Sequence, residues 1–215
     1  MVAQYFSHVQ TWVFDLDNTL YPPSADLFGQ MDARFAAYVS RLTGMETAEA
    51  LKLCTDYWVS HGSTLAGLME HHDLDPHHFL ADVHDIDISH LMVDDALRAA
   101  ISGLDGRKIV YTNGSENHAK RVLAARGLTR QFDAVYGVEH ADFKPKPTQD
   151  AFSKVFAKDG VTPTTAAMFE DEARNLAVPH AMGMRTVHVH PERAEADHIH
   201  HHTDDLTAFL SQLVR

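Results

Sequence analysis

The chain has 215 residues, of which 45% are hydrophobic and 22% are charged, a composition typical of a globular protein. A chain of this length suits one core domain with a small insertion. The formal net charge of −12, with histidine neutral, argues against binding to a nucleic-acid polymer, because such binding depends on Lys and Arg.

The sequence predicts a cytoplasmic protein with no membrane contact. Its first stretch, MVAQYFSHVQTW, has no apolar signal core, and no run of about 18 apolar residues follows. The single cysteine, Cys54, excludes an internal disulfide. The oligomeric state has no signal in the sequence.

Short apolar segments rich in Val, Ile and aromatic residues predict strands. Helical patterns lie between them, the clearest of which begins at the capping residue Ser115 and ends at Gly127. This alternation predicts parallel β-α-β units, and therefore an α/β fold with a Rossmann-like sheet of about five strands. The predicted strands are residues 11–14, 108–112, 133–137, 166–170 and 185–190.

Residues 21–104 interrupt the alternation, because they contain helical patterns and no convincing strand. We expect them to form an all-helical cap over the carboxyl ends of the strands, where open α/β sheets bind ligands. The Rossmann-like core then consists of residues 1–20 and 105–215.

The chain contains 17 histidines, and the densest group is HIHHHT at 198–203, which includes His200, His201 and His202. A metal site needs a fixed geometry and hydrogen-bonded outer partners, which this run does not indicate. We therefore expect a solvated loop.

Polar side chains gather where the predicted strands end. Because the carboxyl ends of parallel strands meet at one edge of a sheet, we expect these side chains to share one site. They are Asp15 and Asp17 after the first strand, Thr112, Asn113 and Gly114 after the second, Lys144 and Lys146 before the helix at 149, and Glu170 and Asp171 after the fourth.

The acidic members of this group suit the transfer of a phosphoryl group. The carboxylates of Asp15 and Asp171 and the backbone carbonyl of Asp17 are oxygen ligands of the kind that Mg²⁺ prefers. Asp15 is then placed to attack phosphorus and form an aspartyl-phosphate. Asp17 is placed to protonate the leaving alkoxide and later to activate water.

The remaining members suit the binding of phosphate. Thr112 and the N–H groups near Asn113 and Gly114 stand at a helix start, where anions bind favourably. A lysine adds positive charge for the phosphoryl oxygens. The spacing of KPTQDAF favours Lys146, while Lys144 remains the alternative.

Four segments, DLDNT, TNG, KP and FEDEARN, are similar in kind and order to the four motifs of the haloacid dehalogenase-like hydrolase superfamily. The resemblance covers residues 12–176. It implies a Rossmann-like core with an inserted cap, and a helical cap between the first and second motifs matches the first cap subclass of that superfamily.

More narrowly, DLDNTLYPPSADLF and the stretch GSTLAGLMEHHDLDPHHFLADVHDID resemble the pyrimidine 5′-nucleotidase branch. This resemblance implies a Mg²⁺-dependent phosphomonoesterase that acts on small nucleotides such as UMP or CMP. A sugar-phosphate phosphatase, a phosphomutase and a noncatalytic nucleotide-binding or scaffold protein are the alternatives. A haloacid dehalogenase is disfavoured by Asp17 and by the Glu170–Asp171 pair.

Substrate selection is expected from the cap, because the core handles only the phosphate. Tyr21, Tyr57, His61 and Thr64 are candidates for this role. Tyr21 follows the first motif, so we expect it at the mouth of the pocket, where its ring would stack on a base.

Overall fold

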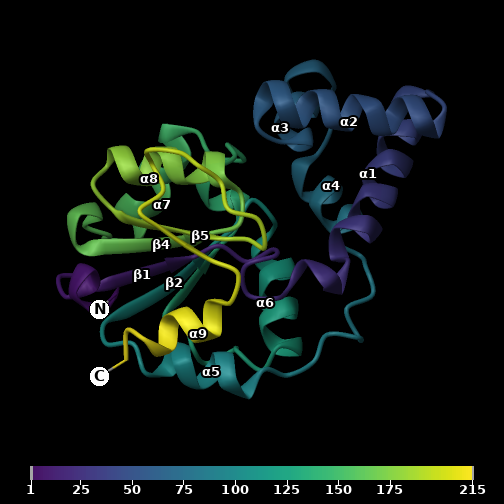
Figure 1. Ribbon diagram of the computed structural model, residues 1–215. Coiled ribbons are helices and arrows are strands. Elements are labelled where there is room, and N and C mark those ends of the chain that lie inside the picture. The colour runs from purple at the N-terminus through teal and green to yellow at the C-terminus, as the bar shows by residue number, and fades with distance from the viewer. Residues whose placement is uncertain (1, 215) are drawn as a thin grey trace.

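The computed structural model describes residues 2–214 and contains one parallel six-stranded sheet in the order β3-β2-β1-β4-β5-β6 (Figure 1). The predicted α/β class with a parallel, Rossmann-like sheet is confirmed, with one strand more than expected. The strands are β1 (Thr11–Phe14), β2 (Arg107–Tyr111), β3 (Ala134–Tyr136), β4 (Ala166–Glu170), β5 (Arg185–Val189) and β6 (His201–Thr203).

The extra strand, β6, comes from the histidine-rich run, so the expectation of a solvated loop is wrong there. His201 pairs with Val187 of β5, and its ring packs 5.1 Å from that of Phe6. The Thr186 hydroxyl donates to the His198 carbonyl at 2.7 Å and ties the incoming loop to β5. This edge strand is short and only half buried, so it has no apolar pattern that would reveal it in the sequence.

Helices cover both faces of the sheet, because the strands carry apolar side chains on both faces and these must be buried. Trp12 and Phe14 of β1 belong to one hydrophobic cluster, and Val13 between them belongs to the other. The first face carries α5 (Asp95–Ser102), α6 (Glu116–Ala125) and α9 (Leu206–Ser211); the second carries α7 (Gln149–Asp159) and α8 (Ala177–Ala181).

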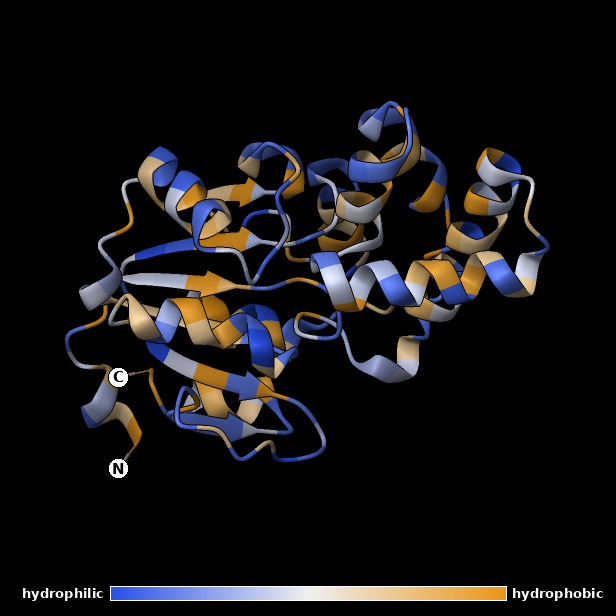
Figure 2. Ribbon diagram, turned by 90° about the horizontal axis from the view of Figure 1, so that it is seen from above, coloured by the Kyte–Doolittle hydropathy of each residue, from blue (hydrophilic) through white to orange (hydrophobic). Residues whose placement is uncertain are grey.

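The helices show both apolar and polar stretches when coloured by hydropathy, as expected for helices with one buried face (Figure 2). Among residues 2–214, no helix combines the length and the apolar character that crossing a bilayer requires.

Four helices project beyond the carboxyl ends of the strands: α1 (Leu27–Thr43), α2 (Thr47–His61), α3 (Thr64–His71) and α4 (Pro76–Val83). They have a small core of their own, in which Val39, Leu68 and Phe79 are buried. We call α1–α4 the cap. Helix α5, although it lies within the segment expected to form the cap, packs against α9 under the sheet, because its apolar face joins the sheet cluster.

Candidate active site

The site lies where β1, β2 and β4 end, at the centre of the sheet. Phe14 of β1 pairs with both Val110 of β2 and Phe169 of β4, so the residues after these strands lie at one level. The Asp15 N–H donates to the Phe169 carbonyl at 2.9 Å, which places Asp15 beside Glu170. The strand order reverses at β1, where open α/β sheets bind their ligands.

Lys146 is the buried cation of the site. Its Nζ lies 2.6 Å from Asp15 Oδ1 and 2.7 Å from Glu170 Oε2, and it donates to the Tyr111 carbonyl at 3.1 Å. The side chain is 1% exposed. Lys144, by contrast, lies at the surface and pairs with Asp150 at 2.6 Å. The structure therefore places Lys146, the lysine favoured by spacing, at the predicted nucleophile.

Three carboxylates lie close together at Lys146, and two of them contact it. Oxygens of Asp15, Glu170 and Asp171 lie within 4.8 Å of one another. Burial and the neighbouring Glu170 raise the pKa of both Asp15 and Asp171, although Lys146 opposes the effect. Lys146 alone therefore does not stabilise all three carboxylates in their charged forms, whereas a divalent cation such as Mg²⁺, which prefers hard oxygen donors, would do so.

Asp171 is held by two residues whose role was not predicted from the sequence. The Asn18 side-chain amide donates to Asp171 Oδ2 at 3.3 Å. His188 of β5 donates from Nε2 to the Asp171 carbonyl at 2.8 Å. Outer hydrogen bonds of this kind orient the first ligands of a metal.

Asp17 accepts three hydrogen bonds from residues outside the carboxylate cluster. Its Oδ1 accepts from the Tyr21 hydroxyl at 2.8 Å and from His118 Nε2 at 3.1 Å, and its Oδ2 accepts from the Thr112 hydroxyl at 3.3 Å. Burial disfavours the charged form, but His118 and these donors outweigh it and lower the pKa of Asp17 to about 2. Asp17 is therefore an ionised carboxylate in this state, and only its carbonyl is left for the predicted metal role.

The prediction that Tyr21 lies at the mouth of the pocket and stacks on a base is wrong. The Tyr21 side chain is 2% exposed and belongs to the hydrophobic cluster under the sheet. The turn after Asp17, in which Leu20 donates to the Leu16 carbonyl at 2.9 Å, brings Tyr21 back into the core. The ring is therefore structural, and the hydroxyl holds Asp17.

The loop after β2 forms another part of the site. Thr112, Asn113 and Gly114 all line the cavity, as predicted for a phosphate loop. The Gly114 N–H donates to Thr112 Oγ1 at 2.9 Å. Asn113 holds the backbone of Lys146 on both sides, since its Oδ1 accepts from the Lys146 N–H at 2.7 Å and its Nδ2 donates to the Lys146 carbonyl at 3.2 Å. Asn113 thus positions the lysine.

His84 connects the cap to this loop. It ends α4, and its ring stacks on that of His118 with centroids 4.4 Å apart. The Ser115 Oγ accepts from the backbone N–H of His118 and is hydrogen-bonded to His84 Nδ1 at 3.2 Å. Burial and the neighbouring His118 lower the pKa of His84 to about 3, so a neutral cap histidine packs against the group that holds Asp17.

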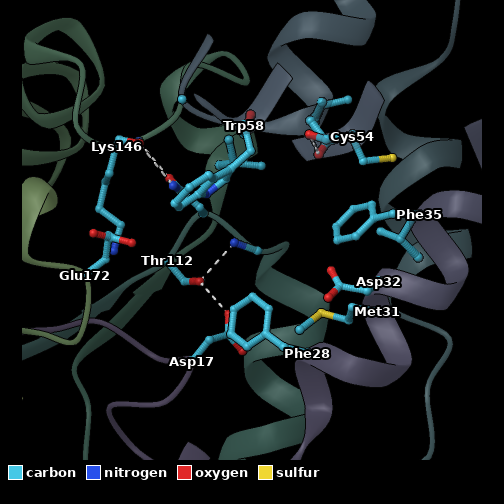
Figure 3. A pocket seen from close by; sticks show the side chains of 18 of the residues that line it. Asp17, Phe28, Met31, Asp32, Phe35, Cys54, Trp58, Thr112, Lys146 and Glu172 are labelled. Carbon is cyan, nitrogen blue, oxygen red and sulfur yellow. Dashed lines mark hydrogen bonds between the residues drawn. The ribbon is translucent and has the colours of Figure 1, made fainter. Parts of the chain in front are cut away.

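A cavity of about 560 Å³ lies between the core and the cap (Figure 3). Its core side carries the charged and polar residues described above. Its cap side is mainly apolar and includes Phe28, Met31, Phe35, Cys54 and Trp58. Of the cap candidates, Thr64 lines the cavity, whereas Tyr57 and His61 are not among its lining residues.

Arg174 joins the loop after β4 to the cap. Its guanidinium lies 3.9 Å from the centre of the Trp58 ring, a favourable cation–π arrangement. It also donates to the Gly62 carbonyl at 3.4 Å. Neither Arg174 nor Trp58 was singled out from the sequence, because their contact joins positions that are far apart along the chain.

The fold and the site together define an α/β protein with a buried carboxylate–lysine cluster beneath a helical cap. The chain belongs to the haloacid dehalogenase-like hydrolase family, whose family model matches residues 9–183. The superfamily predicted from the four motifs is thereby confirmed.

Curated relatives carry phosphate-related names. The chain is 24% identical over 192 residues to phosphate metabolism protein 8 of Saccharomyces cerevisiae, covering 81% of this chain and 60% of that protein. It is 31% identical over 123 residues to the fructose-1-phosphate phosphatase YqaB of Escherichia coli, covering 54% of this chain and 64% of YqaB. The chain thus spans somewhat less than two thirds of the length of these relatives.

Solved structures share the fold at low sequence identity. The HAD phosphatase of Thermococcus onnurineus has a TM-score of 0.64 at 16% identity, with 95% of this chain and 98% of that chain covered. The HAD-hydrolase YfnB of Bacillus subtilis, solved bound to magnesium, has a TM-score of 0.63 at 14% identity, with the same coverage.

Proposed function

We propose that the protein is a Mg²⁺-dependent phosphomonoesterase that forms an aspartyl-phosphate on Asp15. The observation that carries this proposal is the contact of Lys146 Nζ with Asp15 and Glu170, beside Asp171, at the base of the cavity. A nucleophilic carboxylate needs positive charge nearby before a phosphate dianion can approach it. Lys146 supplies part of this charge.

A divalent cation would favour the ionised forms of Asp15 and Asp171, which burial and Glu170 disfavour. The carboxylates of Asp15 and Asp171 and the carbonyl of Asp17 would hold Mg²⁺, while Glu170 keeps Lys146 in place. When bound, the metal reduces the repulsion between Asp15 and the phosphate and helps to neutralise charge that develops on the phosphoryl oxygens. The magnesium-bound YfnB, which shares the fold, supports this choice of metal.

The chemistry then proceeds in two steps. An Asp15 oxygen attacks phosphorus, the bond to the leaving oxygen breaks, and Asp17 gives that oxygen a proton. In the second step Asp17 takes a proton from water, the water oxygen attacks phosphorus, and the bond to Asp15 breaks to release phosphate.

Asp17 must gain a proton before the first step, and the geometry indicates how. The Thr112 hydroxyl donates to Asp17 in this state but lines the cavity, where a phosphate oxygen would accept the same proton. Substrate binding would thereby remove one donor from Asp17 and bring the negative charge of the phosphate close to it, and both changes favour the protonated form of Asp17.

The substrate class that we favour is a pyrimidine mononucleotide. The Phe28 and Trp58 side chains are 42% and 43% exposed, and both line the apolar cap wall. Aromatic surfaces of this kind suit a planar base better than the hydroxyl groups of a sugar. A sugar phosphate is the second candidate, supported by the similarity to fructose-1-phosphate phosphatase.

Phosphate release from a panel of phosphomonoesters tests the proposal. The panel holds UMP, CMP, dUMP, TMP, AMP, GMP, nicotinamide mononucleotide and several sugar phosphates, each with Mg²⁺ and with EDTA. We expect Mg²⁺-dependent release with a preference for pyrimidine nucleotides. Preference for sugar phosphates would keep the chemistry and reject the nucleotide assignment, whereas turnover of 2-chloroacids alone would reject the phosphatase mechanism.

A further inference from the structure

We propose that the cap carries a second metal site, which binds a divalent transition cation such as Zn²⁺ through His61, Glu70 and His71. We call these three residues the cap histidine site. His61 ends α2, and Glu70 and His71 lie in the last turn of α3. The site is separate from the active-site carboxylates, and its proposal does not depend on the proposed function.

The spacing of the three side chains matches a small cation. One ligand atom of each lies within 4.8 Å of the others, and His61 Nε2 lies 3.5 Å from Glu70 Oε2. Metal–ligand bonds of about 2.0–2.1 Å in a tetrahedron place the ligand atoms about 3.4 Å apart. Glu70 is exposed, so a small rotation of its side chain completes this arrangement.

The tautomer of His61 is the one that a metal needs. The Ser60 hydroxyl donates its only proton to the Asp56 carbonyl at 2.6 Å, so its oxygen must accept from His61 Nδ1 at 2.7 Å. With the proton on Nδ1, the lone pair of neutral His61 is on Nε2 and faces the Glu70 carboxylate. Two acceptors 3.5 Å apart repel each other unless a proton or a metal cation lies between them, and a metal-bound imidazole usually donates its other ring N–H to an outer partner, as His61 Nδ1 does to Ser60.

Packing between α2 and α3 holds both imidazoles in place. The Tyr57 ring lies nearly parallel to that of His71, with centroids 5.4 Å apart, and meets the His61 ring edge-on at 5.3 Å. Gly67 permits this packing, since a Cβ at residue 67 would collide with the Tyr57 ring. Because the rings are already oriented, less side-chain entropy is lost when a metal binds.

The donor set decides the class of metal. Two imidazole nitrogens and one carboxylate suit Zn²⁺, Ni²⁺, Co²⁺ or Cu²⁺, whereas Mg²⁺ prefers an all-oxygen octahedron. Three protein ligands leave the fourth position of a tetrahedron open to water, because Glu70 and His71 face solvent.

The position of the site gives the metal a structural consequence. Gly62, directly after His61, lines the cavity, and its carbonyl accepts from Arg174 of the core. A metal that joins the end of α2 to α3 therefore braces the turn at the edge of the cavity. We expect it to stabilise the cap against unfolding.

A second cluster in the described part of the chain, Glu116, Glu139 and His140, offers a matched control. Its ligand atoms are just as close. However, His140 Nδ1 accepts from the Gly137 N–H at 3.1 Å, so the ring proton is on Nε2, the nitrogen 3.7 Å from Glu116. This proton occupies the position on Nε2 at which a metal ion would bind. We therefore expect no tight metal binding at this second cluster.

Zn²⁺ titration by calorimetry, with Mg²⁺ saturating and no substrate present, tests the site. Wild-type protein and H140Q should bind Zn²⁺ alike, whereas H61Q, E70Q and H71Q should each bind at the cap at least about tenfold more weakly. Added Co²⁺ should give the visible absorption of a tetrahedral complex in wild type and H140Q only.

Two outcomes overturn the proposal. One is Zn²⁺ binding in H61Q and H71Q with the stoichiometry and affinity of the wild type. The other is an equal loss of binding in H140Q. Far-UV circular dichroism on each variant verifies folding, and because no turnover is measured, the result stands whether or not the phosphatase proposal holds.

Discussion

The charge state of each active-site carboxylate depends on the side chains that contact it. Lys146 lies between two carboxylates, while Asp17, only two residues from Asp15, is held apart by Tyr21, His118 and Thr112. The two aspartates therefore have opposite electrostatic environments: the pKa of Asp15 is raised and that of Asp17 is lowered. In the proposed mechanism each pKa must move in the opposite direction during the reaction: a bound divalent cation would favour the ionised form of Asp15, and a bound phosphate would favour the protonated form of Asp17.

Asp15→Asn should abolish turnover while the fold persists. The amide has nearly the shape of the carboxylate but does not attack phosphorus, so we expect the rate of phosphate release to fall by more than about a thousandfold. Steady-state assays and circular dichroism measure the two effects. A folded variant with near-native activity would exclude Asp15 as the nucleophile.

His118→Ala should impair substrates with poor leaving groups most. The substitution removes the contact that orients the Asp17 carboxylate. We expect this loss of orientation to outweigh the accompanying rise in the pKa of Asp17, so proton transfer to an alkoxide should slow by about tenfold or more. p-Nitrophenyl phosphate, whose leaving group needs little protonation, should be affected much less. His118→Gln, which retains an N–H donor, is the control. An equal loss with both substrates would indicate that His118 only supports the fold.

At the scale of the elements, the contact between α4 and α6 connects the cap to the catalytic loop. It consists of a buried neutral histidine, His84, stacked on His118 and hydrogen-bonded to Ser115. Because His84 belongs to the cap and the other two to the core, its protonation state affects how the two parts hold together.

Acidification should weaken this contact. The folded-state pKa of His84 is lowered from 6.5 to about 3, so below pH 6.5 the unfolded chain takes up a proton that the folded chain does not. Stability should therefore fall as the pH decreases from 7 to 5, by up to about 2 kcal/mol from this residue. Urea unfolding of wild type and His84→Gln at both pH values measures the effect. An identical loss in the two proteins would contradict the assignment.

At the scale of the whole molecule, the layered core and the cap enclose a cavity whose two sides differ. The core side supplies charge and the cap side supplies apolar surface (Figure 3). Such a division suits a hydrolase that handles one constant group, the phosphate, and a variable leaving group. If Mg²⁺ binds at the core side as proposed, the stability of the protein should depend on it.

Mg²⁺ should raise the thermal unfolding temperature, and EDTA should lower it. Binding to the folded state alone stabilises by about 2.7 kcal/mol when the free metal is at a hundred times its dissociation constant. Asp171→Asn should remove most of this shift, whereas Asp150→Asn, at the surface beside Lys144, should retain it. A full Mg²⁺ shift in Asp171→Asn, measured by scanning fluorimetry, would place the metal elsewhere.

The sequence by itself determined the class of fold and the location of the site. Alternating apolar strands and amphipathic helices are local patterns, and in a parallel sheet they force Asp15, Thr112 and Asp171 toward one edge. The motif spacing also favoured Lys146, which the structure places beside Asp15. These features were predictable because each depends on residues within a few positions of one another.

Only the tertiary structure decided which side chains contact across long stretches of chain. Asp17 meets His118 over 101 positions, and Arg174 reaches Gly62 over 112. The predicted position of Tyr21 was wrong because the turn after Asp17 directs its side chain into the core. Strand β6 was not predicted because an edge strand of histidines has no apolar pattern. These contacts are selected by the packing free energy of the whole core. That free energy depends on residues far apart in the sequence, so a local sequence pattern does not predict it.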